Sequence, residues 1–148
     1  MDTPVERHLV QITALLESSG LPTDDLQTLD LSLFRVVVSE GQLEAVGGLE
    51  RLGCLALLRS LATVEGARSR GLGRQLVKEL LALAQAEGVE EVYLLTESAE
   101  QYFSSLGFRE IDRAFVPQGI KESEQFSSLC PGTATVMMKQ LPTVTRIE

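Results

Sequence analysis

The amino-acid sequence predicts an α/β fold, with one domain over residues 1–148 in which a mixed sheet is flanked by helices. The prediction rests first on the alternation of short β-branched runs with longer runs that have helical spacing. A length of 148 residues is also sufficient for one hydrophobic core. Finally, no stretch has the composition of a linker, so we predict no domain boundary.

The N-terminal half is predicted to form two helices and then three strands. Leucine and isoleucine recur at helical spacing near the start, and Gly20 is a natural end for that helix. The dipeptide Glu40-Gly41 lies between two apolar runs and predicts the turn of a β-hairpin. The predicted elements are a helix over 5–19, a short helix from Thr23 or Asp24 to Leu29, and strands over 33–39, 43–52 and 54–64.

The C-terminal half is predicted to contain one long amphipathic helix and several smaller elements. Leu72, Leu76, Leu80 and Ala84 repeat every four residues, which is the spacing of one helix face. Gly88 ends this helix. The remaining predicted elements are strands over 89–96, 108–116 and 133–139 and short helices over 99–105 and 118–125.

Composition and charge exclude several classes of function. The formal net charge of -8 makes nucleic acid and anionic membranes poor partners. One histidine, His8, and two distant cysteines, Cys54 and Cys130, argue against a metal centre or a Ser-His-Asp triad. The N-terminus lacks the pattern of a signal peptide, and no apolar run has the length of a membrane span. We therefore expect a cytoplasmic protein.

The sharpest motif is RSRGLGR, residues 68–74, between a predicted strand and the long helix. Glycines let the backbone approach an anion closely, and a helix start presents unpaired N–H groups and a partial positive charge. Together these features form a phosphate cradle, to which arginines add charge-assisted contacts. The glycines do not fit a P-loop, because no Lys-Ser or Lys-Thr follows them. They do not fit a dinucleotide-binding fold either, because the third glycine is missing.

The motif resembles the R/Q-x-x-G-x-G/A signature of the GNAT superfamily of N-acetyltransferases, with Arg68, Gly71 and Gly73 at the fixed positions. The segments LLRSLATVEGA and GVEEVYLLTESAEQYFSSLGF resemble its fourth and fifth strands with their exits. This resemblance, over nearly the whole chain, implies a mostly antiparallel sheet, with the usual first strand short or missing here, and acetyl-CoA as acetyl donor. The implied cofactor-binding residues are Leu61, Ala62, Thr63 and Val64 beside the pantetheine, Arg68, Ser69, Arg70, Gly71, Leu72, Gly73 and Arg74 around the pyrophosphate, and Phe103.

Two subfamilies are similar in finer detail. N-acetylglutamate synthase has an LTTR…WF…GF…LP…K pattern. The corresponding residues here are Leu95-Thr96-Glu97, Tyr102-Phe103, Gly107-Phe108, Val116-Pro117 and Lys121. Small acetyltransferases encoded with arsenic-resistance genes have a TxEFxSLCP segment, and 123–131 (SEQFSSLCP) matches it more closely. Glu97 stands where the synthase has an arginine, which argues against glutamate bound in the synthase manner. Phe103 stands where many members have a tyrosine as general acid, and Tyr102 precedes it, about 100° away on a helix.

The acceptor is predicted to be a small amine or an amino-acid-like molecule that attacks the thioester directly as a neutral amine. Arg59 and Glu97 are the substrate-binding candidates, because charge in an apolar run is costly unless it is used or paired. Glu97 is also the candidate base. The structural alternatives are an ion pair for Arg59 and a favourable carboxylate at a helix start for Glu97. We expect Tyr102 to be a core residue and Glu44, Glu50 and Glu65 to be solvated. Cys130 is expected to be an inert buried residue, with binding of an arsenical through its thiolate as the alternative that the family context suggests.

A non-catalytic acyl-CoA-binding sensor of the same fold is the alternative function, because Phe103 lacks the hydroxyl of a general acid. Acetylation of proteins is disfavoured, because the short chain has no insertion that would bind a peptide. No metal is predicted. The partner is predicted to be a small-molecule amine, with a homodimer left open.

Overall fold

The computed structural model describes residues 8–21, 23, 31–123, 126 and 133–142. The chain forms two compact units, which are described separately. Unit 1 consists of Met1–Glu50 and Leu58–Leu80, and unit 2 of Arg51–Leu57 and Leu81–Glu148. That residues 1–148 form a single domain stays a prediction.

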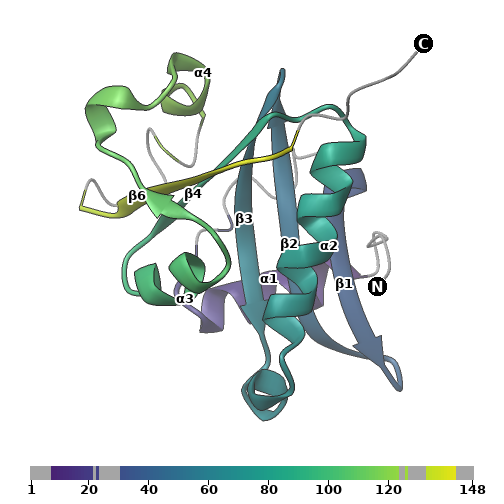
Figure 1. Cartoon of the computed structure of the whole chain (residues 1–148). Coiled ribbons are helices and arrows are strands. Elements are labelled where there is room, and N and C mark those ends of the chain that lie inside the picture. Colours follow the sequence, from purple (N-terminus) through teal and green to yellow (C-terminus); the bar gives the residue numbers. More distant parts are fainter. Residues whose placement is uncertain (1–7, 22, 24–30, 124–125, 127–132, 143–148) are drawn as a thin grey trace. The chain divides into compact units, whose positions relative to one another are not determined.

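The helices and strands alternate as the sequence predicts (Figure 1). In chain order they are α1 Leu9–Ser18, the 3-10 turn η3 Leu31–Leu33, β1 Phe34–Ser39, β2 Gln42–Leu52, β3 Leu55–Thr63, the 3-10 turn η4 Glu65–Arg70, α2 Leu72–Ala86, β4 Glu91–Thr96, α3 Glu100–Ser105, β5 Arg109–Glu110, the 3-10 turn η5 Arg113–Phe115, α4 Gln118–Lys121 and β6 Thr135–Gln140.

The strands form one six-stranded sheet in the order β1-β2-β3-β4-β6-β5. β1 with β2, β4 with β6, and β5 with β6 are antiparallel. β3 and β4 are parallel, with the register Leu55–Glu91, Ala56–Val92 and Leu57–Tyr93. The predicted mixed, mostly antiparallel sheet flanked by helices is therefore confirmed.

The hairpin between β1 and β2 closes at the predicted dipeptide. Ser39 pairs with Gln42, so the loop has only two residues. Their φ angles are 51° at Glu40 and 76° at Gly41. Two consecutive positive φ angles are those of a type I′ turn, whose twist matches the twist of the flanking strands.

In unit 1, helices cover both faces of the strands. Side chains alternate between the two faces of a strand, and Val46 of β2 packs in a buried cluster with Ile12 and Leu16 of α1. At the next residue, Gly47, a Cβ would lie 3.0 Å from the side chains of Leu61 and Leu80, the latter on α2. α1 therefore lies on one face and the first part of α2 on the other, as Figure 1 shows.

In unit 2, the two short helices lie on opposite faces of β6. Val136 and Met138 pack in a second buried cluster with Tyr93 of β4 and with Ile120 of α4. Thr135 and Lys139 point to the other face by strand alternation. Both side chains form hydrogen bonds to the α3 segment there.

Two C-terminal predictions are wrong. The strand predicted over 108–116 is reduced to the two residues of β5, because Asp112 accepts a hydrogen bond from the backbone of Ala114 and initiates η5 instead. The helix predicted over 118–125 ends at Lys121. The short helix predicted through Leu29 lies outside the described residues.

The described residues begin inside the first predicted helix, and β1 is the first strand among them. None of the helices in this described part of the chain is long and apolar enough to span a bilayer.

We predict that Gly48→Ala destabilises unit 1 by about 1–3 kcal/mol, because a side chain forced into a filled core causes strain. A Cβ on Gly48 would lie 2.4 Å from the ring of Phe34, its cross-strand partner. A lower midpoint of urea unfolding would measure the effect.

Gly119→Ala is the matched control. Gly119 lies in α4, and a Cβ there meets nothing within 4 Å. Alanine is also the better helix former, so this variant should keep the wild-type midpoint or exceed it. Equal midpoints for the two variants would contradict the packing argument.

Candidate functional site

The glycine-rich segment of unit 1 forms a sharp junction between β3 and α2. After β3, the chain makes the 3-10 turn η4, which ends at Gly71 with φ 71° and ψ 20°. This left-handed conformation favours glycine, because it has no Cβ. A Cβ on Gly71 would meet no protein atom within 4 Å. The glycine is therefore required by backbone conformation, and its outer side faces open space.

The start of α2 follows directly. The N–H of Gln75 donates to the carbonyl oxygen of Gly71 at 3.1 Å, which is the first bond of the helix. The N–H groups of Leu72 and Gly73 come before this bond, in the turn where a helix provides no acceptor. Aligned peptide dipoles give this end a partial positive charge. The junction thus has the chemistry of an anion site that Gly71 leaves open to a ligand.

At the end of β3, some of the backbone groups already form hydrogen bonds within unit 1. The N–H of Val64 donates to the carbonyl of Glu44 at 2.8 Å, and the carbonyl of Val64 accepts from Ala67 at 3.0 Å. Because backbone groups of successive strand residues point to opposite edges, we expect the N–H of Ala62 to point towards β2 like the N–H of Val64. The groups of Leu61 and Thr63 point to the other edge of β3.

A buried ion pair precedes this strand end. The guanidinium Nη1 of Arg59 lies 3.1 Å from Oε1 of Glu50, and the two side chains are 1% and 18% exposed. Arg59 Nε also donates to the hydroxyl of Ser60 at 3.1 Å. Ser60 has a φ of 57°, which is uncommon for a residue other than glycine. The prediction that Glu50 is solvated is wrong, and Arg59 has the ion pair that is one of its two predicted roles, while its role towards a substrate stays a prediction.

In unit 2, Glu97 follows the last residue of β4. Its side chain is exposed. The backbone N–H at the start of α3, that of Ala99, donates to Oγ1 of Thr96 at 3.0 Å. No side chain caps the helix from the N-cap position. The terminal hydrogen bond of α3 is thus supplied by Thr96, and Glu97 projects from the short connection between the two elements.

The two neighbouring aromatic residues of α3 differ in burial. Phe103 is 9% exposed, whereas Tyr102 is 37% exposed, so the prediction that Tyr102 is a core residue is wrong. Phe103 packs edge-to-face against Tyr102 at 5.2 Å and against Phe108 at 5.9 Å between ring centroids. The position at which the resemblance predicts a general acid in many members therefore has a buried ring without a hydroxyl here.

Tyr93 of β4 is a buried hydroxyl that the sequence analysis did not single out. Its OH donates to Oε1 of Glu91 at 3.1 Å. Burial raises the pKa of Tyr93 from 10.0 to about 12, the bond to Glu91 and its negative charge add to this, and Arg109 acts in the opposite direction. Tyr93 is therefore protonated at neutral pH and serves as a hydrogen-bond donor rather than a base.

The structure places the predicted residues in both units. The strand end and the junction with α2 belong to unit 1, as does Arg59, whereas Glu97 and Phe103 belong to unit 2. Cys130 lies outside the described residues, and so do the side chains of Arg68, Ser69 and Arg70. Within the described part of the chain, no three His, Cys, Asp or Glu side chains form a group that fits a metal ion.

The sheet and the strand–turn–helix junction define the fold class that the resemblance predicted. The acetyltransferase (GNAT) domain family matches residues 30–110, more than half of the chain, and the chain belongs to this family. The uncharacterized N-acetyltransferase CT2212 of Chlorobaculum tepidum is 42% identical over 66 residues, which cover 45% of this chain and 42% of that protein. The chain thus matches less than half the length of this relative.

Two solved structures show the same fold. Rv2747 of Mycobacterium tuberculosis, in complex with CoA and NLQ, has a TM-score of 0.81 at 21% identity, over 95% of this chain and 98% of its own. N-acetylglutamate synthase of Neisseria gonorrhoeae, in complex with CoA and L-arginine, has a TM-score of 0.79 at 16% identity, over 95% of this chain and 32% of its own. The predicted structural similarity to the synthase is confirmed, whereas membership of the arsenic-resistance subfamily stays a prediction.

We predict that Glu50→Gln lowers the free energy of unfolding by about 1–3 kcal/mol, because a neutral amide accepts a weaker hydrogen bond from the buried guanidinium of Arg59 than the carboxylate does. Glu87→Gln is the matched control, because Glu87 pairs with Arg51 at 3.4 Å while both side chains are more than 40% exposed. Exposed pairs contribute about 0–1 kcal/mol. Urea unfolding of both variants measures the difference, and equal losses would contradict the importance of the buried pair.

Proposed function

We propose that the protein is an acetyl-CoA-dependent N-acetyltransferase that acts on a small amine or an amino-acid-like acceptor. The observation that carries the proposal is the junction at Gly71, where a left-handed glycine with open space beside it precedes the N-terminus of α2. Membership of the GNAT family and the CoA complexes of structural neighbours support it. A cytoplasmic location and a homodimer stay predictions.

In this proposal, unit 1 binds the donor mainly through its backbone. The pyrophosphate accepts hydrogen bonds from the amides between Ser69 and Arg74, where the helix start favours negative charge. The pantetheine pairs with the edge of β3 that carries the backbone groups of Leu61 and Thr63. The N–H of Val64 already donates to Glu44, so we assign this residue no donor role towards the pantetheine.

The proposed reaction is a direct transfer. The neutral nitrogen of the acceptor attacks the thioester carbonyl, forming the N–C bond, and the C–S bond then breaks to release CoA as a thiolate. Glu97, directly or through water, takes the proton that the ammonium group must lose before the attack, and water takes the second proton, which the bonded nitrogen loses as the amide forms. A backbone N–H of β3 stabilises the developing oxyanion. Because Phe103 has no hydroxyl, the thiolate takes its proton from solvent.

Glu97 and Arg59 are proposed as determinants of the acceptor. The exposed carboxylate of Glu97 attracts a cationic group. The guanidinium of Arg59 lies 3.1 Å from Glu50, so an acceptor carboxylate has to compete with this existing partner. Glutamate, which carries two carboxylates, therefore fits the site less well than a small amine or an acceptor with one carboxylate. The link to arsenic-resistance acetyltransferases rests only on the segment 123–131 and carries no residue role here.

A non-catalytic acyl-CoA sensor is the second candidate. The observation in its favour is the pair of rings on α3, because Phe103 is buried without a hydroxyl and Tyr102 is exposed. Release of free CoA in the presence of a panel of amines separates the two. A sensor binds acetyl-CoA and releases no CoA with any amine, whereas an enzyme turns over with at least one.

We predict that acetyl-CoA raises the melting temperature, as a ligand of the native state must, and that Gly71→Val abolishes this shift. The valine side chain would fill the open space beside the junction and keep the pyrophosphate from the backbone. Differential scanning fluorimetry and titration calorimetry with acetyl-CoA measure both effects.

Gly53→Val is the matched control. Gly53 has a φ of 70° and nothing within 4 Å of a Cβ, so the substitution causes the same backbone strain in a different turn. This variant should melt earlier but keep the full acetyl-CoA shift. The proposal is wrong if acetyl-CoA at saturation gives the wild type neither a thermal shift nor a heat of binding.

We predict that Glu97→Arg changes which amines are acetylated while acetyl-CoA affinity stays within about twofold, since the donor is held by unit 1. Rates with the amine panel and calorimetric titration measure the two properties. Glu110→Arg is the control, because it reverses an exposed charge elsewhere in unit 2. An unchanged acceptor profile in the folded Glu97→Arg variant would show that Glu97 does not contribute to recognition of the acceptor.

A further inference from the structure

The α3 helix of unit 2 is too short to be stable by itself. It has six residues, Glu100–Ser105, whereas isolated helices shorter than about 12–15 residues are marginal in water. Its position must therefore be fixed by contacts with the rest of the unit. Those contacts decide where Phe103, on the helix, and Glu97, just before it, are held.

Side chains of β4 and β6 hold the N-terminal end of α3. Oγ1 of Thr96 accepts from the backbone N–H of Ala99 at 3.0 Å. The hydroxyl of Thr135 lies 3.1 Å from Oε1 of Glu100 and donates to it. Thr96 and Thr135 are direct partners across the β4–β6 pair, so one cross-strand pair of threonines holds this end of the helix.

Lys139 holds the C-terminal end. Its ammonium Nζ donates to the carbonyl oxygen of Leu106, the residue that ends α3, at 3.0 Å. A cation is favourable at this end of a helix, where carbonyl groups lack partners. Gly107 follows with a φ of 94°, and a Cβ there would lie 2.5 Å from Lys139 Nζ. Because glycine has no Cβ, the ammonium group of Lys139 can lie next to Gly107 where it contacts the end of the helix.

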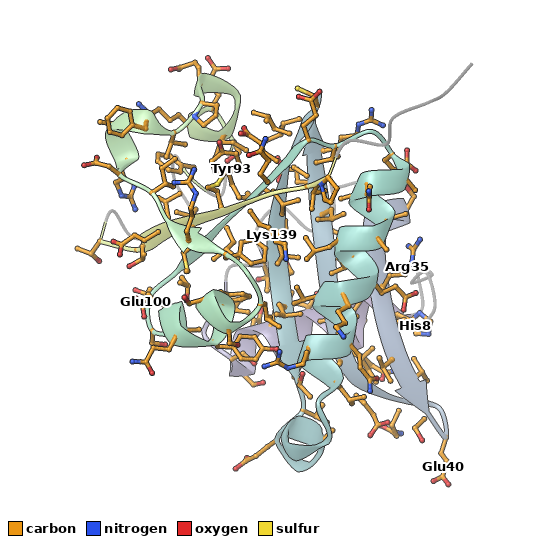
Figure 2. The ribbon with its side chains drawn as sticks, in the orientation of Figure 1. His8, Arg35, Glu40, Tyr93, Glu100 and Lys139 are labelled. Carbon is orange, nitrogen blue, oxygen red and sulfur yellow. The ribbon has the colours of Figure 1, made fainter. Side chains whose placement is uncertain are left out.

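The distance between Thr135 and Lys139 along β6 is similar to the length of α3. From Thr135 to Lys139 the strand rises about 13 Å, at about 3.3 Å per residue. From Ala99 to Leu106 the helix rises about 10 Å, at about 1.5 Å per residue. Two side chains on one face of β6 thus reach opposite ends of α3. Glu100 of α3 and Lys139 of β6 are labelled in Figure 2.

We propose that Lys139 and Thr135 are positioning residues for acetyl transfer, which act by fixing α3 and the connection that carries Glu97. The inference rests on the proposed function. Neither residue touches the substrate in this scheme. Since small displacements of reacting groups lower rates strongly, loss of either contact reduces turnover, while binding of the donor by the backbone of unit 1 is retained.

The test compares Lys139→Met, which keeps the length of the side chain and removes the ammonium, with the wild type. We expect kcat per CoA-binding site to fall by about tenfold or more, with the KM for acetyl-CoA within about twofold. Calorimetric titration with CoA counts the competent sites, so that unfolded protein does not lower the apparent kcat. Lys139→Arg, which keeps a cationic donor, should restore most of the rate.

Lys121→Met is the control, because it removes a lysine from α4 in the same unit. It should keep the wild-type kcat. If Lys139→Met does not fold, the kcat of Thr135→Val tests the inference instead, because valine is favourable in a strand and differs from threonine mainly by the missing hydroxyl. A kcat within twofold of wild type in the folded variant overturns the inference. If the wild type neither binds acetyl-CoA nor releases CoA, the proposed function itself has failed.

Discussion

The buried ion pair between Arg59 and Glu50 is the interaction on which the end of β3 depends. Loss of the Glu50 carboxylate is predicted to lower the free energy of unfolding by about 1–3 kcal/mol, and the guanidinium of Arg59 is 1% exposed. The same side chain donates to the hydroxyl of Ser60, the residue whose left-handed φ bends the strand away from regular geometry. Residues 61–64 follow immediately. One buried pair therefore sets the direction of the backbone that we propose to face the donor.

The proposed donor site uses the main chain far more than side chains. Gly71 acts through its φ angle and the space beside it, and α2 acts through its first N–H groups and its dipole. Such contacts require a backbone path and few residue identities. A site of this kind is compatible with the low identity, 16% and 21%, of this chain to two CoA-bound proteins that share its fold with TM-scores of 0.79 and 0.81. The acceptor side of the proposed site, by contrast, depends on side chains such as Glu97, whose identity can differ without a change of fold.

Much of the fold follows from the sequence, because hydrophobic periodicity and turn residues are local signals. The type I′ turn at Glu40-Gly41 and the left-handed Gly71 are of this kind. The strand predicted over 108–116 is not, because the carboxylate of Asp112 stabilises a competing turn. The pair of Arg59 with Glu50 and the contacts of Lys139 depend on strand register and on segments distant in sequence. A single sequence carries no direct signal for either.

The contacts that hold α3 also determine which of its two aromatic rings is buried. Tyr102 and Phe103 are about 100° apart around the helix, so a rotation of α3 would be needed to put the tyrosine in the place of the phenylalanine. Such a rotation breaks the bond of Glu100 with Thr135 and that of Leu106 with Lys139. It also removes Phe103 from Phe108. The helix is thus fixed with the tyrosine on its exposed side and the phenylalanine on its buried side.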